Sequence, residues 1–384
     1  MKIIKLDNRR KVSASFGKAD LQYLLLVILL ALYGTLMVFS AGYAYAEFRY
    51  DDGAYFIKKQ TIWLLVGFAV MIISSRVRPS VYKFLTVPFY TLTIVLLLLV
   101  LIVGFAGNGA QRWISIGPLT IQPSEIAKLT MLMMLSYYFS ENEKRATDKT
   151  SNKNTFVFGT VIPFLIILLP IILVMLQKHL SCIIILGVIG IILIVMSGVG
   201  TKFLSMFMTA GICGVCYIAF FTDYTKQRIT VWQNPEAYKL TGGWQTLQGL
   251  MAIGSGGLFG TGYGKSILKH CYVSEPANDM IFAILCEELG LFGALLSVLL
   301  FSMLVIRGVK IALRTTDTYT RLLALGISVK MATQVLLNIA VVTNTIPNTG
   351  ISLPFFSYGG SSLIMLFFEM GIMLSISRCA RIQK

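Results

Sequence analysis

The residue of this sequence best placed for acid-base chemistry is Asp279, which stands where a polar loop turns into a long apolar run. Pro276 suits a first helical turn and Asn278 is a competent N-cap, so the motif Ser-Glu-Pro-Ala-Asn-Asp predicts a helix start with Asp279 near its positive end. A carboxylate there can accept a proton from a substrate hydroxyl, although most carboxylates at helix starts serve the helix alone. Glu275, four residues earlier, is a competing acid that would lie near the same helical face.

Further along the same expected helix, Glu287 and Glu288 would lie roughly 12–14 Å deeper at about 1.5 Å per residue. The surrounding residues are apolar, so these acids would stand at membrane depth, where a carboxylate needs a partner or a function. Glu125 and Lys128 are three residues apart after Pro123, at the start of another apolar run. They therefore share a helical face, either as an ion pair that only neutralises two charges or as side chains that line a substrate cavity.

Two weaker patterns also carry polar side chains. Lys330, Gln334 and Asn338 follow each other at spacings of four, which predicts an inward polar stripe on one helix, with simple packing as the alternative. Lys178 and His179 lie between two apolar runs, where a histidine can exchange protons but is more often only solvated.

A glycine run from Gly254 to Gly264, followed by Lys-Ser, ends like a phosphate-binding P-loop. A P-loop needs glycine where Phe259 stands, and no strand-to-helix unit is expected here, so we do not expect a nucleotide site. We expect irregular backbone that dips into the membrane interface and lines a cavity, or else a flexible turn.

Composition assigns the class of protein. Hydrophobic residues make up 56% and charged residues 13% of the chain, and the mean hydropathy is +0.77, which excludes an ordinary soluble domain and indicates a polytopic membrane protein. The net charge of +16 resides in short clusters between apolar runs and forms no basic stripe, so no nucleic-acid partner is expected. The six cysteines are scattered, which indicates neither a disulfide framework nor a metal site.

The apolar runs predict an all-α fold of about ten transmembrane helices with one large extracytoplasmic loop. The first run follows a basic segment and is too long for a signal peptide, so we expect it to be a retained span. The expected spans are residues 21–46, 60–75, 82–104, 123–140, 156–176, 180–199, 203–222, 279–306, 321–344 and 358–377.

Lys and Arg are unevenly divided between the two sides of the membrane. Alternating the loops places 21 of these residues on one side and 10 on the other. The positive-inside bias therefore puts both termini, residues 1–20 and 379–384, in the cytoplasm, on either side of a transmembrane domain at 21–378. The loop at about 223–278 and Asp279 then face outward. No nucleotide-activated substrate exists there, so a substrate must arrive already activated on a lipid, or be transported.

Four groups of residues, in this order along the chain, resemble the SEDS (shape, elongation, division, sporulation) family, whose best-known types are FtsW and RodA. The likeness runs from the first expected span to the last. The motifs are Gln111-Arg-Trp-Ile with Ile121-Gln-Pro-Ser-Glu-Ile-Ala-Lys128, Gln245 with Ala252-Ile-Gly-Ser-Gly-Gly-Leu-Phe-Gly260, Glu275 through Gly290, and Pro347-Asn-Thr-Gly-Ile-Ser-Leu-Pro-Phe-Phe-Ser-Tyr-Gly-Gly-Ser-Ser362.

The resemblance implies a peptidoglycan glycosyltransferase of the bacterial cytoplasmic membrane. Members of the family polymerise lipid II into β-1,4-linked glycan at the outer face, release undecaprenyl diphosphate and work in complex with a class B penicillin-binding protein. By position, Asp279 matches the essential aspartate. The residues that the resemblance implies for substrate binding are Glu125, Lys128, Arg112, Trp113, Glu275 and Ser361.

In that chemistry Asp279 would take the proton from the acceptor 4-hydroxyl, while Lys128 or Arg112 would stabilise the departing diphosphate. A divalent cation, Mg²⁺ or Mn²⁺, could share the second task, although the sequence contains no ligand cluster for one. Two departures from the family pattern matter. Gln177-Lys178-His179 replaces the common Gln-Pro-Asp, and Asn278 stands where threonine is common.

The motif around Asp279 leans toward FtsW proteins of Gram-positive bacteria, which favours septal wall synthesis in cell division. Other division or elongation proteins and membrane lipids are then the expected partners. The same activity in lateral-wall elongation or in sporulation is the alternative. A lipid II flippase and a non-catalytic scaffold are hypotheses from other classes: we find no internal duplication of the kind that transporters often carry, and a scaffold would make no demand on Asp279.

Overall fold

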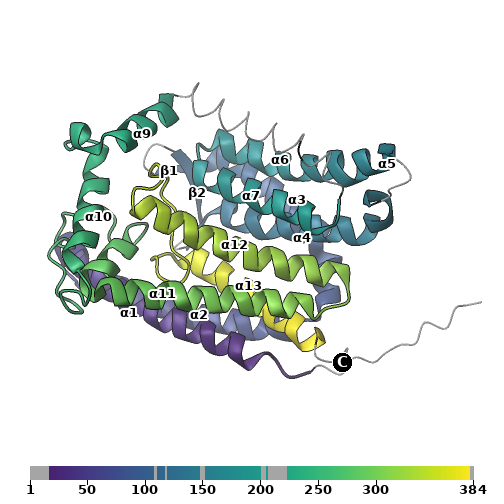
Figure 1. The fold of residues 1–384 in the computed structure, drawn as a ribbon, viewed down its shortest axis with the longest axis horizontal. Helices are drawn as coiled ribbons and strands as arrows, with labels where there is room; N and C mark the ends of the chain where they lie inside the picture. Colours follow the sequence, from purple (N-terminus) through teal and green to yellow (C-terminus); the bar gives the residue numbers. More distant parts are fainter. Residues whose placement is uncertain are drawn as a thin grey trace, which may run out of the picture.

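The computed structural model describes residues 17–107, 110–116, 119–147, 152–199, 205 and 223–380. Long helices run side by side along its longest axis (Figure 1). The elements are α1 Leu21–Tyr50, α2 Tyr55–Arg76, α3 Pro79–Val103, β1 Phe105–Gly107, β2 Ala110–Ile116, β3 Leu119–Ile121, α4 Pro123–Ala146, α5 Asn152–Phe156, the π-helix η1 Val157–Val161, α6 Ile162–Leu176, α7 Leu180–Met196, α9 Asp223–Gln233, the 3₁₀-helix η2 Pro235–Tyr238, α10 Gly243–Gly256, α11 Ile281–Leu313, α12 Thr318–Val342 and α13 Gly360–Ala380.

Seven helical stretches in the described part of the chain are long and apolar enough to cross a membrane: α1, α2, α3, α5 to α6, α11, α12 and α13. The protein is therefore a multi-pass helical membrane protein, as its composition predicts. Of the other expected spans, α7 is shorter than these seven, and α4 carries charged residues in its first and last turns. Residues 203–222 lie outside the described residues apart from Ser205. The count of about ten spans is thus not confirmed.

The outer helices present apolar side chains to their surroundings. On α3, Phe84 and Ile102 are 80% and 79% exposed, and on α2 Ile73 is 66% exposed. Of the 18 most apolar consecutive residues of α3, only 22% are buried, against 61% for the same length of α12 and 67% for α13. Helices α12 and α13 therefore form much of the interior, whereas the exposed apolar faces of α2 and α3 are suited to contact with lipid.

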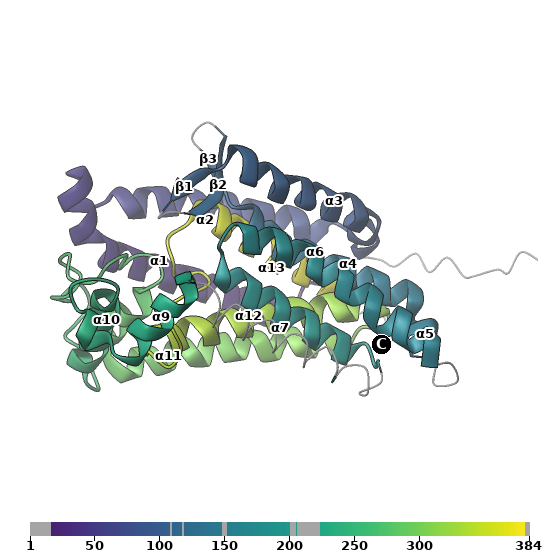
Figure 2. The same cartoon turned by 90° about the horizontal axis from the view of Figure 1, so that it is seen from above.

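A small antiparallel sheet departs from the expected all-α fold. Strands β1, β2 and β3 are three to seven residues long and pair in that order, with Phe105 opposite Trp113 and Ile114 opposite Ile121. Aromatic and β-branched residues favour strands, but so short a segment between two apolar runs is indistinguishable from a loop in sequence. The sheet lies beside the end of α3 (Figure 2) and carries Arg112 on β2.

The helix predicted to begin near Asp279 begins two residues later. Met280 is the N-cap of α11 and makes no side-chain capping bond, so the predicted capping role of Asn278 is wrong. Asn278 Nδ2 instead donates to Glu275 Oε2 at 2.5 Å, and the Asn278 carbonyl accepts from Ser357 Oγ at 2.7 Å. A bond within the loop to Glu275 and a bond from the distant Ser357 replace the capping bond, and Asp279 lies in a turn before the helix.

Helix α11 is interrupted at Gly290, whose φ of 65° and ψ of −162° are not helical. The turn after α10 packs against this break, where the Leu291 N–H donates to the Gly257 carbonyl at 3.0 Å. A Cβ on Gly290 would lie 2.4 Å from the Gly260 nitrogen, so the close approach requires glycine. The first part of the glycine run, which we expected to be irregular, is helical as far as Gly256.

The two acids expected at membrane depth are buried beside this break and hold the loop that follows α10. Glu288 pairs with Lys269, with 2.9 Å between Oε1 and Nζ, and accepts from Ser40 Oγ of α1 at 2.6 Å. Glu287 accepts from Ser266 Oγ at 2.5 Å and from two backbone N–H groups. These partners satisfy both carboxylates, so a structural role accounts for them.

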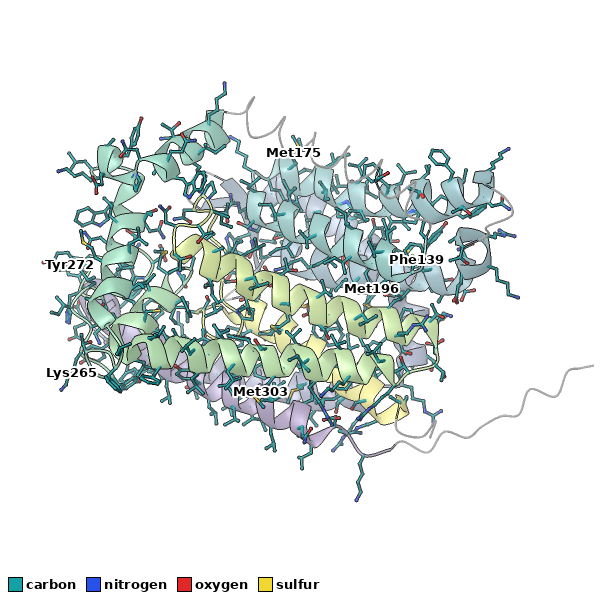
Figure 3. All side chains as sticks on the ribbon, viewed as in Figure 1. Phe139, Met175, Met196, Lys265, Tyr272 and Met303 are labelled. Atoms are coloured by element: carbon teal, nitrogen blue, oxygen red, sulfur yellow. The ribbon has the colours of Figure 1, made fainter. Side chains whose placement is uncertain are left out.

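The two ends of the described chain lie at one end of the molecule, and α9 and α10 lie at the other (Figures 1 and 2). Asp20 and Arg307 form an ion pair at 2.7 Å, and the Asp20 N–H donates to Ser377 Oγ at 3.1 Å, which joins the start of α1 to the ends of α11 and α13. Lys265 and Tyr272 project from the opposite end (Figure 3). The long loop that ends at Asp279 is thus folded on the side away from the termini.

Replacing Gly290 by alanine tests the break in α11. This backbone conformation is essentially restricted to glycine, so we expect Gly290→Ala to destabilise the fold by at least about 1–3 kcal/mol. The matched control is Gly187→Ala in α7, where an added Cβ meets nothing within 4 Å and helix propensity favours alanine. Thermal unfolding of the purified variants is the measurement. Equal unfolding midpoints for Gly290→Ala and the wild type would contradict the close approach.

Candidate functional site

Asp279 lies among polar side chains from segments that are distant in sequence. Gln245 Nε2 of α10 is 3.5 and 3.4 Å from its two carboxylate oxygens, and Gln245 Oε1 accepts from Asn348 Nδ2 at 2.9 Å. Arg228 Nη1 of α9 donates to the Asn348 carbonyl. We call residues 348–357, an irregular segment between α12 and α13, the strap. The Asp279 carboxylate therefore stands between α10 and the strap.

Gly350 of the strap is a close neighbour of the Asp279 carboxylate. A Cβ added at Gly350 would lie 3.6 Å from Asp279 Oδ2, and its φ of +66° favours glycine. The Asp279 side chain is half-buried. Burial, together with the nearby Glu275 carboxylate, raises the pKa of Asp279 to about 6. A carboxylate with that pKa is mostly ionised at neutral pH and is a stronger base than an ordinary aspartate.

Glu275 is the competing acid, but no helix joins it to Asp279. Its φ is 53°, and it lies exposed in a turn before α11. Its carboxylate accepts a hydrogen bond from Asn278 Nδ2. Because Asp279 is better shielded from water and faces the strap, the geometry favours Asp279 over Glu275 as the base.

Glu125 and Lys128 form an ion pair on the first turn of α4, as their spacing predicts. Lys128 Nζ lies 2.8 Å from both Glu125 oxygens, and the two side chains are 2% exposed for Lys128 and 12% for Glu125. Lys128 Nζ is also 3.4 Å from Gln334 Oε1 of α12. The pair is therefore buried, and its opposite charges compensate each other where α4 meets α12.

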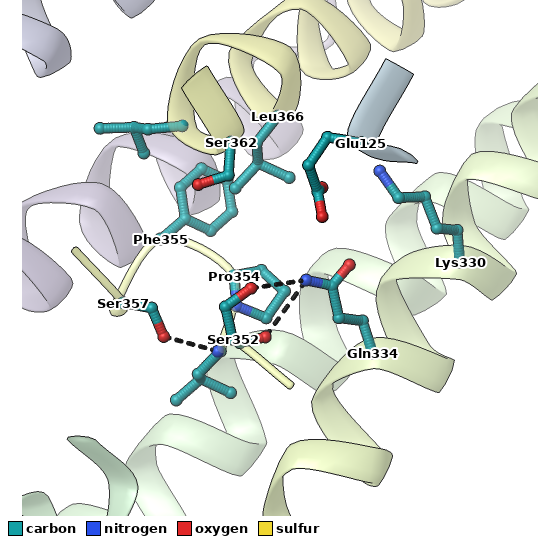
Figure 4. A pocket seen from close by; sticks show the side chains of 11 residues that line it. Glu125, Lys330, Gln334, Ser352, Pro354, Phe355, Ser357, Ser362 and Leu366 are labelled. Carbon is teal, nitrogen blue, oxygen red and sulfur yellow. Dashed lines mark hydrogen bonds between the residues drawn. The ribbon is translucent and has the colours of Figure 1, made fainter. Parts of the chain in front are cut away.

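A polar pocket lies next to this pair (Figure 4). Lys330 on its wall forms a buried ion pair with Glu369 of α13, and Gln334 Nε2 donates to the Ser352 carbonyl of the strap at 3.1 Å. The lining residues come from α4, α12, the strap and α13. They are Glu125, Lys330, Gln334, Ser352, Leu353, Pro354, Phe355, Ser357, Ser362, Leu363 and Leu366. Ser361, which the family resemblance implies for substrate binding, is not among the lining residues, but the next residue of α13, Ser362, is.

Arg112 and Trp113 lie on β2 and are not part of the pocket lining. Arg112 Nε and Nη2 donate to the carbonyls of Gln177 and Lys178 at 3.5 and 2.5 Å. These carbonyls follow the last turn of α6, where helix carbonyls lack intrahelical partners. Arg112 thus fixes the sheet to the connection between α6 and α7, which gives it a structural role.

His179 lies in the connection between α6 and α7. A lone histidine in a loop is usually exposed to solvent, but His179 is buried. Its Nδ1 lies 3.2 Å from Ser124 Oγ at the start of α4. Burial, together with the charge of Arg112, lowers the pKa of His179 to about 3. The imidazole is therefore neutral at physiological pH and serves as a hydrogen-bonding link between the α6–α7 connection and α4.

The expected site residues form two groups that the polar stripe of α12 connects. Gln334 contacts Lys128, and Asn338 Nδ2 donates to the backbone carbonyl of Asp279 at 2.9 Å. Their spacing of four signals the stripe in sequence. Nothing local in the sequence signals Arg228 of α9, whose contact joins this helix to the strap. Asn348 lies within a quoted family motif, but its contact with Gln245 joins distant segments and could not be predicted.

The described residues around Asp279 form no preformed cage for a divalent cation. In the described part of the chain, no group of three or more His, Cys, Asp or Glu side chains could hold a metal ion. Asp279 has Glu275 as its acidic neighbour, and Mg²⁺ commonly takes one or two protein carboxylates and completes its octahedral sphere with water and substrate phosphates. No step of a reaction is assigned to a metal here.

The chain is similar to known proteins over nearly its whole length. The FtsW/RodA/SpoVE family model, described as cell cycle protein, matches residues 20–382. Stage V sporulation protein E of Bacillus subtilis (strain 168) is 37% identical over 94% of this chain and 98% of its own length. A probable peptidoglycan glycosyltransferase FtsW of Geobacter sulfurreducens is 34% identical over 93% of this chain and 95% of its own length. A chain of a solved peptidoglycan synthase complex has the same fold, with a TM-score of 0.78, 24% identity, and coverage of 94% of this chain and 98% of that chain.

Removing one member of the Glu125–Lys128 pair leaves an uncompensated charge in a buried place. We expect Glu125→Gln and Lys128→Met each to destabilise the fold by about 3–5 kcal/mol, and the double variant to lose less than either. The control is Lys58→Ala, since Lys58 pairs with Asp52 where both side chains are exposed, at 66% and 38%, and such pairs contribute little. Thermal unfolding compares the four variants. A double variant less stable than both single variants would show that the charges of Glu125 and Lys128 do not simply compensate each other.

Proposed function

Because the chain belongs to the FtsW/RodA/SpoVE family of cell cycle proteins, we propose that it is a peptidoglycan glycosyltransferase that polymerises lipid II. The family membership confirms the SEDS resemblance of the sequence motifs. The observation that carries the proposed chemistry is Asp279, a half-buried carboxylate with a raised pKa, which stands between α10 and the strap. Its carboxylate contacts Gln245 of α10, and α10 lies at the end of the molecule away from the chain termini (Figure 1).

In this proposal Asp279 is the general base. Its carboxylate takes the proton from the 4-hydroxyl of the acceptor sugar as that oxygen attacks the anomeric carbon of the donor. The new β-1,4 bond forms with inversion while the bond from the anomeric carbon to the diphosphate breaks, and undecaprenyl diphosphate leaves with the bonding electron pair. Gln245, at 3.4 Å from Asp279 Oδ2, holds the carboxylate without neutralising its charge.

We propose that Glu125, which lines the polar pocket, and its neighbours Lys128 and Ser361 contribute to binding lipid II, although the pocket itself is too small for the whole head group. Lys128 and Lys330 carry positive charge in this region, each paired with a carboxylate, Glu125 and Glu369. Fixed positive charge lowers the energy of a departing anion, so a diphosphate would have to compete with these carboxylates for the two lysines. Arg112 and Trp113 stay candidates for an outer contact, although the guanidinium of Arg112 already serves two carbonyls. Glu125→Gln combined with Lys128→Met tests the assignment, since normal polymerisation by a folded double variant would leave the pair a structural role only.

The setting follows from the same reasoning. We propose both termini in the cytoplasm, the 223–278 loop outside, a cytoplasmic-membrane location at the division septum, and a class B penicillin-binding protein as partner. A chain of similar fold comes from a complex that couples polymerization to crosslinking, which supports the partner. The sporulation relative is 37% and the FtsW relative 34% identical, so identity alone does not separate division from sporulation.

The test of the base is Asp279→Asn, which keeps the shape and hydrogen bonding of the side chain but removes its basic oxygen. We expect polymerisation of lipid II to fall by about 10²–10⁴-fold, with protein yield unchanged. In the wild type, kcat/KM should fall as the pH drops through about 6, because protonation at the raised pKa of Asp279 inactivates the base. Steady-state polymerisation rates across pH give both results.

Glu275→Gln is the matched control for this variant, because it changes the neighbouring exposed acid in the same way. We expect it to retain most of the activity. Near wild-type polymerisation by Asp279→Asn, together with failure of Glu275→Gln, would transfer the role of base to Glu275.

Orientation is tested by cysteine labelling at Lys239, which is exposed in the 223–278 loop. In a background with the exposed Cys271 replaced by serine, Lys239→Cys should react with a membrane-impermeant reagent added outside intact cells, because the positive-inside bias places this loop outside. Lys310→Cys, exposed near the end of α11, should react only after permeabilisation. The reverse pattern would overturn both the orientation and an outer-face mechanism.

A further inference from the structure

Asn338 is a buried amide that holds two separate segments together. It is 0% exposed on α12, and its Nδ2 donates to the Asp279 carbonyl at 2.9 Å and to the Ile351 carbonyl at 2.6 Å. Asp279 ends the loop before α11, whereas Ile351 belongs to the strap. One amide group therefore sets the distance between the backbone of Asp279 and the segment that faces its carboxylate.

The strap has no regular secondary structure and is ordered by side chains from several helices. Ser181 of α7 donates to the Thr349 carbonyl, and Ser357 Oγ accepts from the Leu353 N–H at 2.7 Å while donating to the Asn278 carbonyl. Buried backbone groups outside helices and sheets require such partners. The position of the strap against Asp279 thus depends on a few hydrogen bonds, of which those of Asn338 are the most enclosed.

Gln334 makes the same kind of contact one helical turn away. It donates to Ser352 of the strap at 3.1 Å and accepts from Lys128 at 3.4 Å. The spacing of four places Gln334 and Asn338 on one face of α12. On that face, Asn338 binds the strap next to Asp279, and Gln334 binds it next to the Glu125–Lys128 pair.

We infer that Asn338 is a positioning residue for Asp279: it fixes the backbone of Asp279 and the strap at one distance, and so holds the base where it meets the acceptor hydroxyl. The inference rests on the proposed glycosyl transfer for its readout. Asn338 touches neither the carboxylate nor a reacting atom, so it acts only through Asp279. A displacement of about 1 Å at a reacting group can lower a rate by about 10²-fold, which makes such a role measurable.

The pH dependence gives a readout that lost stability alone would not move. The charged groups that act on the Asp279 carboxylate are Glu275 in its own loop and Arg228 of α9, while Gln245 of α10 supplies a neutral donor. Burial is the largest cause of its raised pKa. If Asn338→Ala lets the loop separate from the strap, water reaches the carboxylate and its pKa falls toward that of an ordinary aspartate.

The experiment compares Asn338→Ala with Ser328→Ala, using purified full-length protein with its cognate penicillin-binding protein and lipid II as substrate. Ser328 is a buried polar residue of the same helix whose hydroxyl donates to the Ala324 carbonyl within α12. We expect Asn338→Ala to lower kcat by about 10–10²-fold with KM unchanged, and to move the acidic limb of kcat/KM to lower pH. Ser328→Ala should match the wild type in all three. Asn338→Ser, which keeps one donor, should fall between.

Two results would overturn the inference. An unchanged acidic limb, with activity lost only in proportion to folded protein, would make Asn338 a purely structural residue. A raised KM with unchanged kcat would place its effect on substrate binding. If Asn338→Ala does not fold, the acidic limb of kcat/KM measured for Asn338→Ser alone tests the inference. If the wild type and Ser328→Ala polymerise lipid II, either of these results contradicts only the inference about Asn338. If neither of them polymerises lipid II, the proposed function itself is contradicted.

Discussion

The constraint on which this structure depends is that polar groups buried within a helical membrane protein must find partners inside the protein. Among the described residues, three buried ion pairs meet it: Lys128 with Glu125, Lys269 with Glu288, and Lys330 with Glu369. Each pair except the first joins residues far apart in sequence. Because removing one partner would strand a charge, the second and third pairs fix which segments lie together.

The same constraint orders the segments that are not helical. The strap and the turn before α11 have backbone groups that no helix or sheet pairs, and side chains of α12, of α7 and of the strap itself supply the missing donors. The break at Gly290 is held in the same way, by backbone bonds to the turn after α10. The half-buried Asp279 is thus positioned by groups that are themselves fixed. A fixed carboxylate suits catalysis, because a preorganised base needs no rearrangement during the reaction.

Sequence alone predicts the features that depend on local pattern. Hydropathy indicates the multi-pass helical class, the spacing of three places Glu125 and Lys128 on one face, and the spacing of four identifies the stripe of Gln334 and Asn338. The start of α11 could not be predicted, because Asn278 bonds to Glu275 and Ser357 rather than capping the helix. The partners of Asp279 and the burial of His179 depend likewise on contacts between distant segments, which no local pattern encodes. The role of Asp279 itself came from family resemblance and stays a proposal.

The most direct measurement of the central claim is the fate of labelled lipid II in vesicles that contain the purified protein and its cognate penicillin-binding protein. An enzyme with its base fixed at the outer face should convert lipid II on the membrane side bearing the 223–278 loop into long glycan strands, and should leave lipid II on the other side untouched. Lipid II that crosses the membrane without forming polymer would contradict this account and would favour a transporter.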